Sequence, residues 1–174
     1  MLQLATGGET VQRDQTEFSR LFDEYHGLVF RTAYRITGNA ADAEDVLQTI
    51  FLRLIRRAGG KTLESEESYL RRAAVNASLD VIRAKQTNSA VSLREVPSAD
   101  SEPNTGDMKD CLRQAFGRLS PRSAEIFALR YLEDFSNQQI ARMLGISQVL
   151  VAVTLHRTRR QLQKEIRSYF GGKL

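Results

Sequence analysis

The stretch from residue 136 to residue 162 constrains the fold of this chain more than any other. Ser136 followed three residues later by Gln139 has the form of a capping box, in which a hydroxyl and an amide satisfy N–H groups at a helix start. Gly145 suits the left-handed position that ends a helix, and Ser147 can cap a second helix directly after it. The pattern therefore predicts two short helices joined by a tight turn, which is a helix-turn-helix.

The second of these helices is predicted to be apolar along one face and basic at its far end. Val151, Leu155 and Leu162 recur at spacings of four and seven residues. The later turns carry His156, Arg157, Arg159 and Arg160. Because a helix-turn-helix places its second helix in the major groove, the pattern indicates DNA binding. An ordinary helical hairpin with a solvated basic face is the alternative that the pattern leaves open.

Charge is distributed unevenly along the chain. Residues 1–85 hold 12 basic and 12 acidic side chains, whereas residues 108–174 hold 12 basic against five acidic, an excess of seven. The intervening residues 86–107 hold one against four. The basic excess therefore coincides with the predicted helix-turn-helix, as expected of a module that binds phosphates.

Composition excludes several classes of site. Lone Cys111 rules out a disulfide framework, and His26 and His156 are too few for a zinc cluster. No glycine-rich phosphate loop, paired carboxylate motif or nucleophile motif is present, so we expect neither an enzyme nor a cofactor. No signal peptide or membrane-spanning run is evident, so the sequence favours a soluble protein of a reducing cytoplasm with no membrane insertion.

Apolar periodicity predicts three helices in the first half of the chain, with no strand candidate. The first begins near Glu17, with Thr16 as its cap, and stops at Gly38. Asn39 caps the second, which ends before residues 59–60, and Ser65 caps the third. We expect a compact bundle of three or four helices.

The periodicity fails between the two halves. The sequence of this stretch is rich in Ser, Asn, Asp and Pro, a composition typical of a linker. Beyond it, Ser120 followed by Pro121 predicts the start of a further helix. The expected fold is all-α, with two small helical domains joined by a flexible linker. The predicted divisions are a flexible arm 1–15, a bundle 16–86, a linker 87–107 and a four-helix domain with the helix-turn-helix, 108–174.

Three stretches together resemble the sigma factors of bacterial RNA polymerase, in the small two-domain extracytoplasmic-function (ECF) group. They are residues 43–53 (AEDVLQTIFLR), residues 69–83 (YLRRAAVNASLDVIR) and residues 119–162. They occur in the family's order and spacing. The resemblance implies a factor that binds core RNA polymerase and directs promoter-specific initiation of transcription. Its implied partners are promoter DNA and the polymerase, through the β′ clamp helices and the β subunit.

The resemblance also implies three sets of site residues. The polymerase-binding set is Asp45, Gln48, Leu52, Arg53 and Arg56. The set for the −10 promoter element is Gly60, Lys61, Arg72, Asn76, Asp80, Arg83 and Lys85. The set for the −35 element is Ser136, Gln138, Ser147, Gln148, Leu150, Thr154, His156, Arg157, Arg159 and Arg160. For Asn76 and Asp80 the open alternative is hydrogen bonding that fixes their helix against its neighbours, and for Tyr69 we favour a core position over base stacking.

The chain departs from the family pattern at three places. Thr49 replaces a usual acidic residue, which is expected to weaken one polymerase contact. The basic run after the −10 helix is thin, at residues 83–86. Residues 149–155 lack the Lys and Arg of the family's recognition helix, so we predict either an unusual −35 preference or a surface that binds a protein.

Two other interpretations of the sequence compete with the sigma-factor interpretation. A DNA-binding regulator with no polymerase contact accounts for the helix-turn-helix but not for residues 43–53. An enzyme built on a helical bundle lacks any candidate site. Many members of the family are sequestered by an anti-sigma protein, and the sequence leaves open whether this chain has such a partner.

Overall fold

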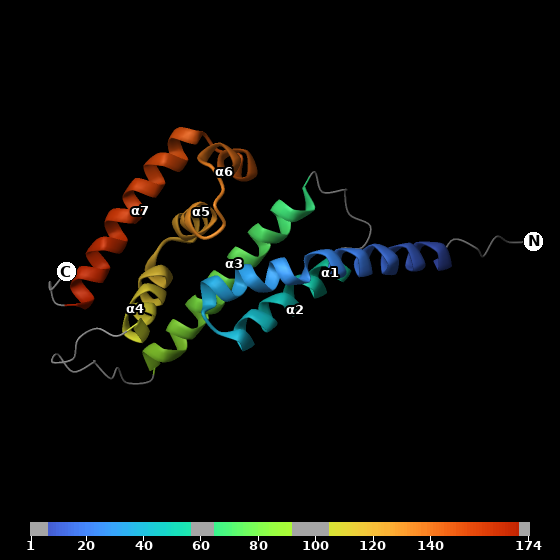
Figure 1. Ribbon diagram of the computed structural model, residues 1–174, viewed down its shortest axis with the longest axis horizontal. Helices are drawn as coiled ribbons and strands as arrows, with labels where there is room; N and C mark the ends of the chain where they lie inside the picture. Colours follow the sequence, from blue (N-terminus) through green and yellow to red (C-terminus); the bar gives the residue numbers. More distant parts are fainter. Residues whose placement is uncertain (1–6, 57–64, 92–104, 171–174) are drawn as a thin grey trace, which may run out of the picture.

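The computed structural model describes residues 7–56, 65–91 and 105–170, and every regular element among them is an α-helix. In chain order the helices are α1 (Gly7–Thr37), α2 (Ala40–Arg56), α3 (Glu66–Val91), α4 (Thr105–Arg118), α5 (Pro121–Tyr131), α6 (Asn137–Leu144) and α7 (Gln148–Tyr169). Figure 1 shows α1, α2 and α3 lying together, with α4 and α5 against another side of α3. The predicted all-α class is confirmed.

The first three helices form a bundle around an apolar core. Val29 of α1, Val46 of α2 and Leu70 of α3 are almost completely buried within one cluster. Each such side chain contributes about 1.5–3 kcal/mol to folding through the removal of its apolar surface from water. Gly38 takes a positive φ of 66° between α1 and α2, and Asn39 Oδ1 accepts a hydrogen bond from the Asp42 N–H at 3.1 Å. The predicted stop and cap are both confirmed.

The helix-turn-helix has the caps that the sequence predicts. Ser136 Oγ accepts from the Gln139 N–H at 3.2 Å, and Gln139 Oε1 accepts from the Ser136 N–H at 2.8 Å, which completes the capping box. Gly145 ends α6 in the left-handed conformation, and Ser147 Oγ accepts from the Leu150 N–H at 3.1 Å. The axes of α6 and α7 meet at a bend of 110°.

Three helices are longer than predicted: α1 and α4 begin earlier, and α3 ends later. α1 begins at Gly7, so the prediction of a loose arm with Thr16 as helix cap is wrong for residues 7–15. Residues 9–15 include Glu, Gln and Arg, which lose little side-chain freedom in a helix and so allow the extension. α3 continues to Val91 and α4 begins at Thr105, so helix covers both ends of the predicted linker, whose residues 92–104 lie outside the described ranges.

The two halves of the chain share a continuous apolar core. Ile36 of α1 and Val75, Leu79 and Ile82 of α3 are buried in the same cluster as Ile126, Leu129 and Ile140 of the second half. Burial of this kind is the dominant favourable term when helical surfaces pack. The second half is therefore packed against the first over α3.

The described part of the chain offers neither a metal centre nor a simple membrane span. Within it, no three His, Cys, Asp or Glu side chains are grouped to hold a metal ion. None of its helices is by itself long and apolar enough to cross a membrane, and only the bent pair of α6 and α7 passes by length and composition.

Candidate nucleic-acid and protein interfaces

One face of α2 presents the five residues predicted to bind polymerase. The opposite face buries Ala43, Val46, Ile50 and Phe51, which fixes the rotation of the helix. The outward set is exposed throughout: Asp45, Gln48, Leu52, Arg53 and Arg56. Leu52 is 52% exposed and neighbouring Ile55 is 49% exposed, so apolar surface lies among the charges. A surface of this mixed character is typical of a protein-binding site, in which apolar anchors are surrounded by charged groups.

Arg72 and Asn76, predicted to contact the −10 element, both contact a carboxylate from the second half of the chain in this structure. Arg72 Nε lies 2.7 Å from Glu125 Oε1, and Asn76 Nδ2 donates to the same oxygen at 2.9 Å. Arg72 Nη1 also donates to the Met143 carbonyl at 3.4 Å. Asn76 therefore fixes α3 against a neighbouring helix, and that neighbour is α5.

The other predicted −10 residues on α3 have partners on the first three helices. Arg83 pairs with Asp80 one turn earlier at 3.1 Å, and Lys85 Nζ lies 2.6 Å from Asp42 Oδ2 on α2. Gly60 and Lys61 lie outside the described residues. Tyr69 is partly buried and packs against the core of the first three helices, which favours the packing role over base stacking.

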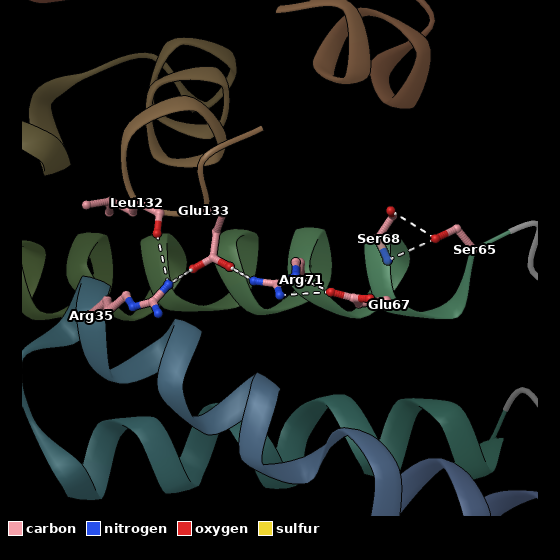
Figure 2. Close-up of polar contacts among 7 residues, drawn as sticks. All are labelled: Arg35, Ser65, Glu67, Ser68, Arg71, Leu132 and Glu133. Atoms are coloured by element: carbon pink, nitrogen blue, oxygen red, sulfur yellow. Dashed lines mark hydrogen bonds and ion pairs between the residues drawn. The ribbon is translucent and has the colours of Figure 1, made fainter. Parts of the chain in front are cut away.

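A second contact between the halves was not predicted from the sequence. Glu133, in the turn after α5, has a fully buried side chain, which lies 3.2 Å from Arg35 Nη1 and 2.5 Å from Arg71 Nη1. Figure 2 shows this carboxylate reaching between an arginine of α1 and an arginine of α3. Burial alone would lower the pKa of Arg71, but hydrogen bonds to Glu67 and Glu133 raise it overall, so the guanidinium stays charged.

The helix-turn-helix presents a surface that changes character along α7. Val151, Leu155, Thr158 and Leu162 face inward. On the outside, Val149 is 73% exposed, Leu150 49% and Val153 39%. The exposed cationic and titratable group follows on later turns: His156, Arg157, Arg159 and Arg160. Apolar side chains therefore occupy the first turns, where a recognition helix contacts base edges, and the cations come after them.

The remaining residues predicted to read the −35 element lie on or beside the same surface. Gln138 and Gln148 are exposed, and Thr154 is half-buried. The hydroxyls of Ser136 and Ser147 are engaged in capping α6 and α7. These two serines therefore position the helices, because each hydroxyl accepts a hydrogen bond from a backbone N–H at a helix start.

Comparisons with known proteins identify the family to which this chain belongs. Residues 21–87 match the family model described as sigma-70 region 2, and residues 109–162 match sigma-70, region 4. The RNA polymerase sigma-E factor of Streptomyces avermitilis is 30% identical over 154 residues, which cover 84% of this chain and 86% of that protein. The ECF RNA polymerase sigma factor SigL of Mycobacterium tuberculosis is also 30% identical, over 82% of this chain and 85% of its own length. This chain is an ECF sigma factor.

The sigma factor also has a counterpart among solved structures, a chain of the RsbN–BldN complex. That chain is 25% identical, and the match covers 89% of this chain and 97% of the other with a TM-score of 0.34. As a member of the family, this sigma factor is a non-enzymatic subunit that recognises promoter DNA and directs RNA polymerase to initiate transcription.

Proposed function

We propose that this sigma factor binds core RNA polymerase through the exposed face of α2, which is defined by Asp45, Gln48, Leu52, Arg53 and Arg56. The observation that carries the proposal is that all five side chains are exposed on one face while the opposite face is buried. The expected counterpart is the pair of β′ clamp helices. Thr49 on α2 is half-buried and uncharged, so it adds no ionic contact to this surface.

We further propose that α3 and the loop before it act at the −10 element. Opening a promoter requires bases to leave the stack, at a cost of a few kcal/mol each, and that cost is offset by binding the extruded bases. Asn76 carries an amide suited to base edges, and Arg72 carries a guanidinium suited to phosphate. Gly60 and Lys61 of the loop belong to this proposal on their sequence position alone.

The second half is proposed to act at the −35 element through α7. Its exposed cations, Arg157, Arg159 and Arg160, suit DNA phosphates, whereas Val149, Leu150 and Val153 suit thymine methyl groups. A second possibility at this surface is protein binding, which the exposed apolar turns favour. An anti-sigma protein is the class of protein partner that we propose for this surface. We also propose that the protein acts in the cytoplasm, where its proposed partners, polymerase and promoter DNA, are found.

The experiment that tests the proposal is co-elution of the purified protein with core RNA polymerase in size-exclusion chromatography at moderate salt. We expect one complex that contains both, because the α2 face is exposed in the free protein. A folded, helical protein that elutes apart from the polymerase would contradict the proposal and leave a regulator that contacts DNA alone.

A further inference from the structure

We propose that the protein has a binding site for a small anionic amphiphile, a molecule with an apolar tail and a carboxylate or phosphate head. The site is an open pocket of about 350 Å³, lined by residues from the end of α1, from α3, from α4 and from the segment after α5. Its volume lies near the lower end of the range for small-molecule sites, about 300–1,000 Å³. None of the proposed polymerase or promoter residues lines it, so this site is independent of the proposed function.

Most of the pocket lining is apolar. Ile36 of α1 and Ile82 of α3 are 7% and 6% exposed and belong to the core that the two halves share. Leu112 and Phe116 of α4 and Leu132 after α5 are partly buried and complete the apolar lining. An apolar tail placed there would leave water and gain dispersion contacts with these side chains.

The α4 side of the pocket changes from charged to apolar along the helix. Four of its residues line the pocket at helical spacing: Lys109, Leu112, Arg113 and Phe116. Offsets of three, four and seven residues put all four on one face of the helix. Lys109 is exposed, whereas Phe116 is partly buried. The face therefore has a polar end and an apolar end, as an amphiphile does.

The charged residues that line the pocket are all cations, namely Arg35, Lys109 and Arg113. Arg35 lies beside Leu132 (Figure 2), where its Nη1 donates to the Leu132 carbonyl at 3.0 Å and lies 3.2 Å from Glu133 Oε1. Its Nε and Nη2 make no hydrogen bond within the described residues. A guanidinium carries five N–H donors, so this arginine retains donors for a further anion.

The two cations on α4 differ in their partners. Arg113 pairs with Asp110, and its Nη1 donates to the Thr37 carbonyl at 3.5 Å. Lys109 is exposed and has no ion-pair partner in the part of the chain that the structure describes. Asp110 does not line the pocket. A cleft lined by charges of one sign attracts the opposite sign, so the preferred head group is an anion.

The size of the pocket favours a small molecule over a protein segment. One turn of α-helix is 5.4 Å long and about 10 Å across with its side chains, which corresponds to roughly 400 Å³. That volume already exceeds the pocket. A partner protein could therefore place only single side chains in it, whereas a short acyl chain with an anionic head fits both the apolar lining and the cations.

Isothermal titration calorimetry of the full-length protein with decanoate and with decyl phosphate tests the ligand class. We expect saturable binding of at least one of these anions at a single site, and the arm that binds identifies the head group. Decanol and decyltrimethylammonium should bind about tenfold more weakly or worse, because they lose the charge-assisted hydrogen bonds. No saturable binding of either anion at millimolar concentration would overturn the proposal, as would equal binding of decyltrimethylammonium.

Two variants test the location, and circular dichroism checks that each is helical. Lys109→Glu should weaken binding of the anion about fivefold or more, because it removes one exposed attraction and adds a repulsion. Lys164→Glu is the matched control, since Lys164 is exposed on α7 and does not line the pocket. Leu112→Trp fills the pocket and should abolish binding. Unchanged affinity in Lys109→Glu would overturn the assigned head-group contact, and unchanged affinity in Leu112→Trp would overturn the pocket as the site.

Discussion

Asp45→Arg combined with Arg53→Glu is expected to weaken binding to core RNA polymerase by about 100-fold or more, which corresponds to roughly 2.7 kcal/mol. Both side chains are exposed on α2, and at the proposed interface each reversal would turn a complementary charge into a repulsive one. The buried face of α2 is untouched, so the bundle should keep its fold. A loss of affinity would therefore come from the changed interface and not from unfolding of the protein.

A titration of labelled protein with core polymerase measures this effect. The matched control is Asp23→Arg with Arg31→Glu, which reverses one acid and one base at exposed positions of α1. We expect the control to bind like the wild type. Equal losses in both double variants would show that charge pattern in general, and not the α2 face, governs binding.

Ala152→Lys combined with Thr154→Arg is expected to tighten binding to duplex DNA about tenfold and to steepen its salt dependence. Each phosphate contact contributes about 0.9 to the slope of log affinity against log salt, so two contacts should add roughly 1.8. Ala152 is exposed and Thr154 half-buried, beside an apolar surface formed by Val149, Leu150 and Val153. The present surface exposes apolar side chains and has no cation at these two positions.

Fluorescence anisotropy with a labelled random-sequence duplex at several salt concentrations measures both quantities. Gln114→Lys with Gln163→Arg is the control, because it adds the same charge at exposed sites away from the first turns of α7. An unchanged affinity and slope for the Ala152 and Thr154 variant would count against DNA binding by this surface. The protein-binding alternative would then be favoured.

Local chemistry made most helix boundaries predictable from the sequence. Ser136 with Gln139, Gly145 and Ser147 act within a few residues of their own positions, so their hydrogen bonds follow from short spacings. The start of α1 was not predictable in this way, because residues 7–15 carry no apolar period from which a helix could be inferred. The exposed face of α2 was predictable because its apolar stripe fixes which residues point outward.

The contacts between the two halves could not be predicted in the same way. Glu125 lies 53 residues from Arg72 and Glu133 lies 62 residues from Arg71, and no local spacing relates such pairs. One signal was present, since a lone acid inside the apolar stretch of α5 requires a buried partner. That signal identifies Glu125 as unusual without naming the side chain that it binds.

Transcription by reconstituted polymerase is the direct test of whether this protein initiates transcription at specific promoters. Core RNA polymerase would be incubated with and without this protein on pooled linear templates that carry randomised upstream sequence, and the transcripts would be sequenced. We expect transcripts that require the protein and that come from templates sharing two separated sequence blocks. Formation of a stable complex with no protein-dependent transcript from any template would contradict promoter-specific initiation by this protein.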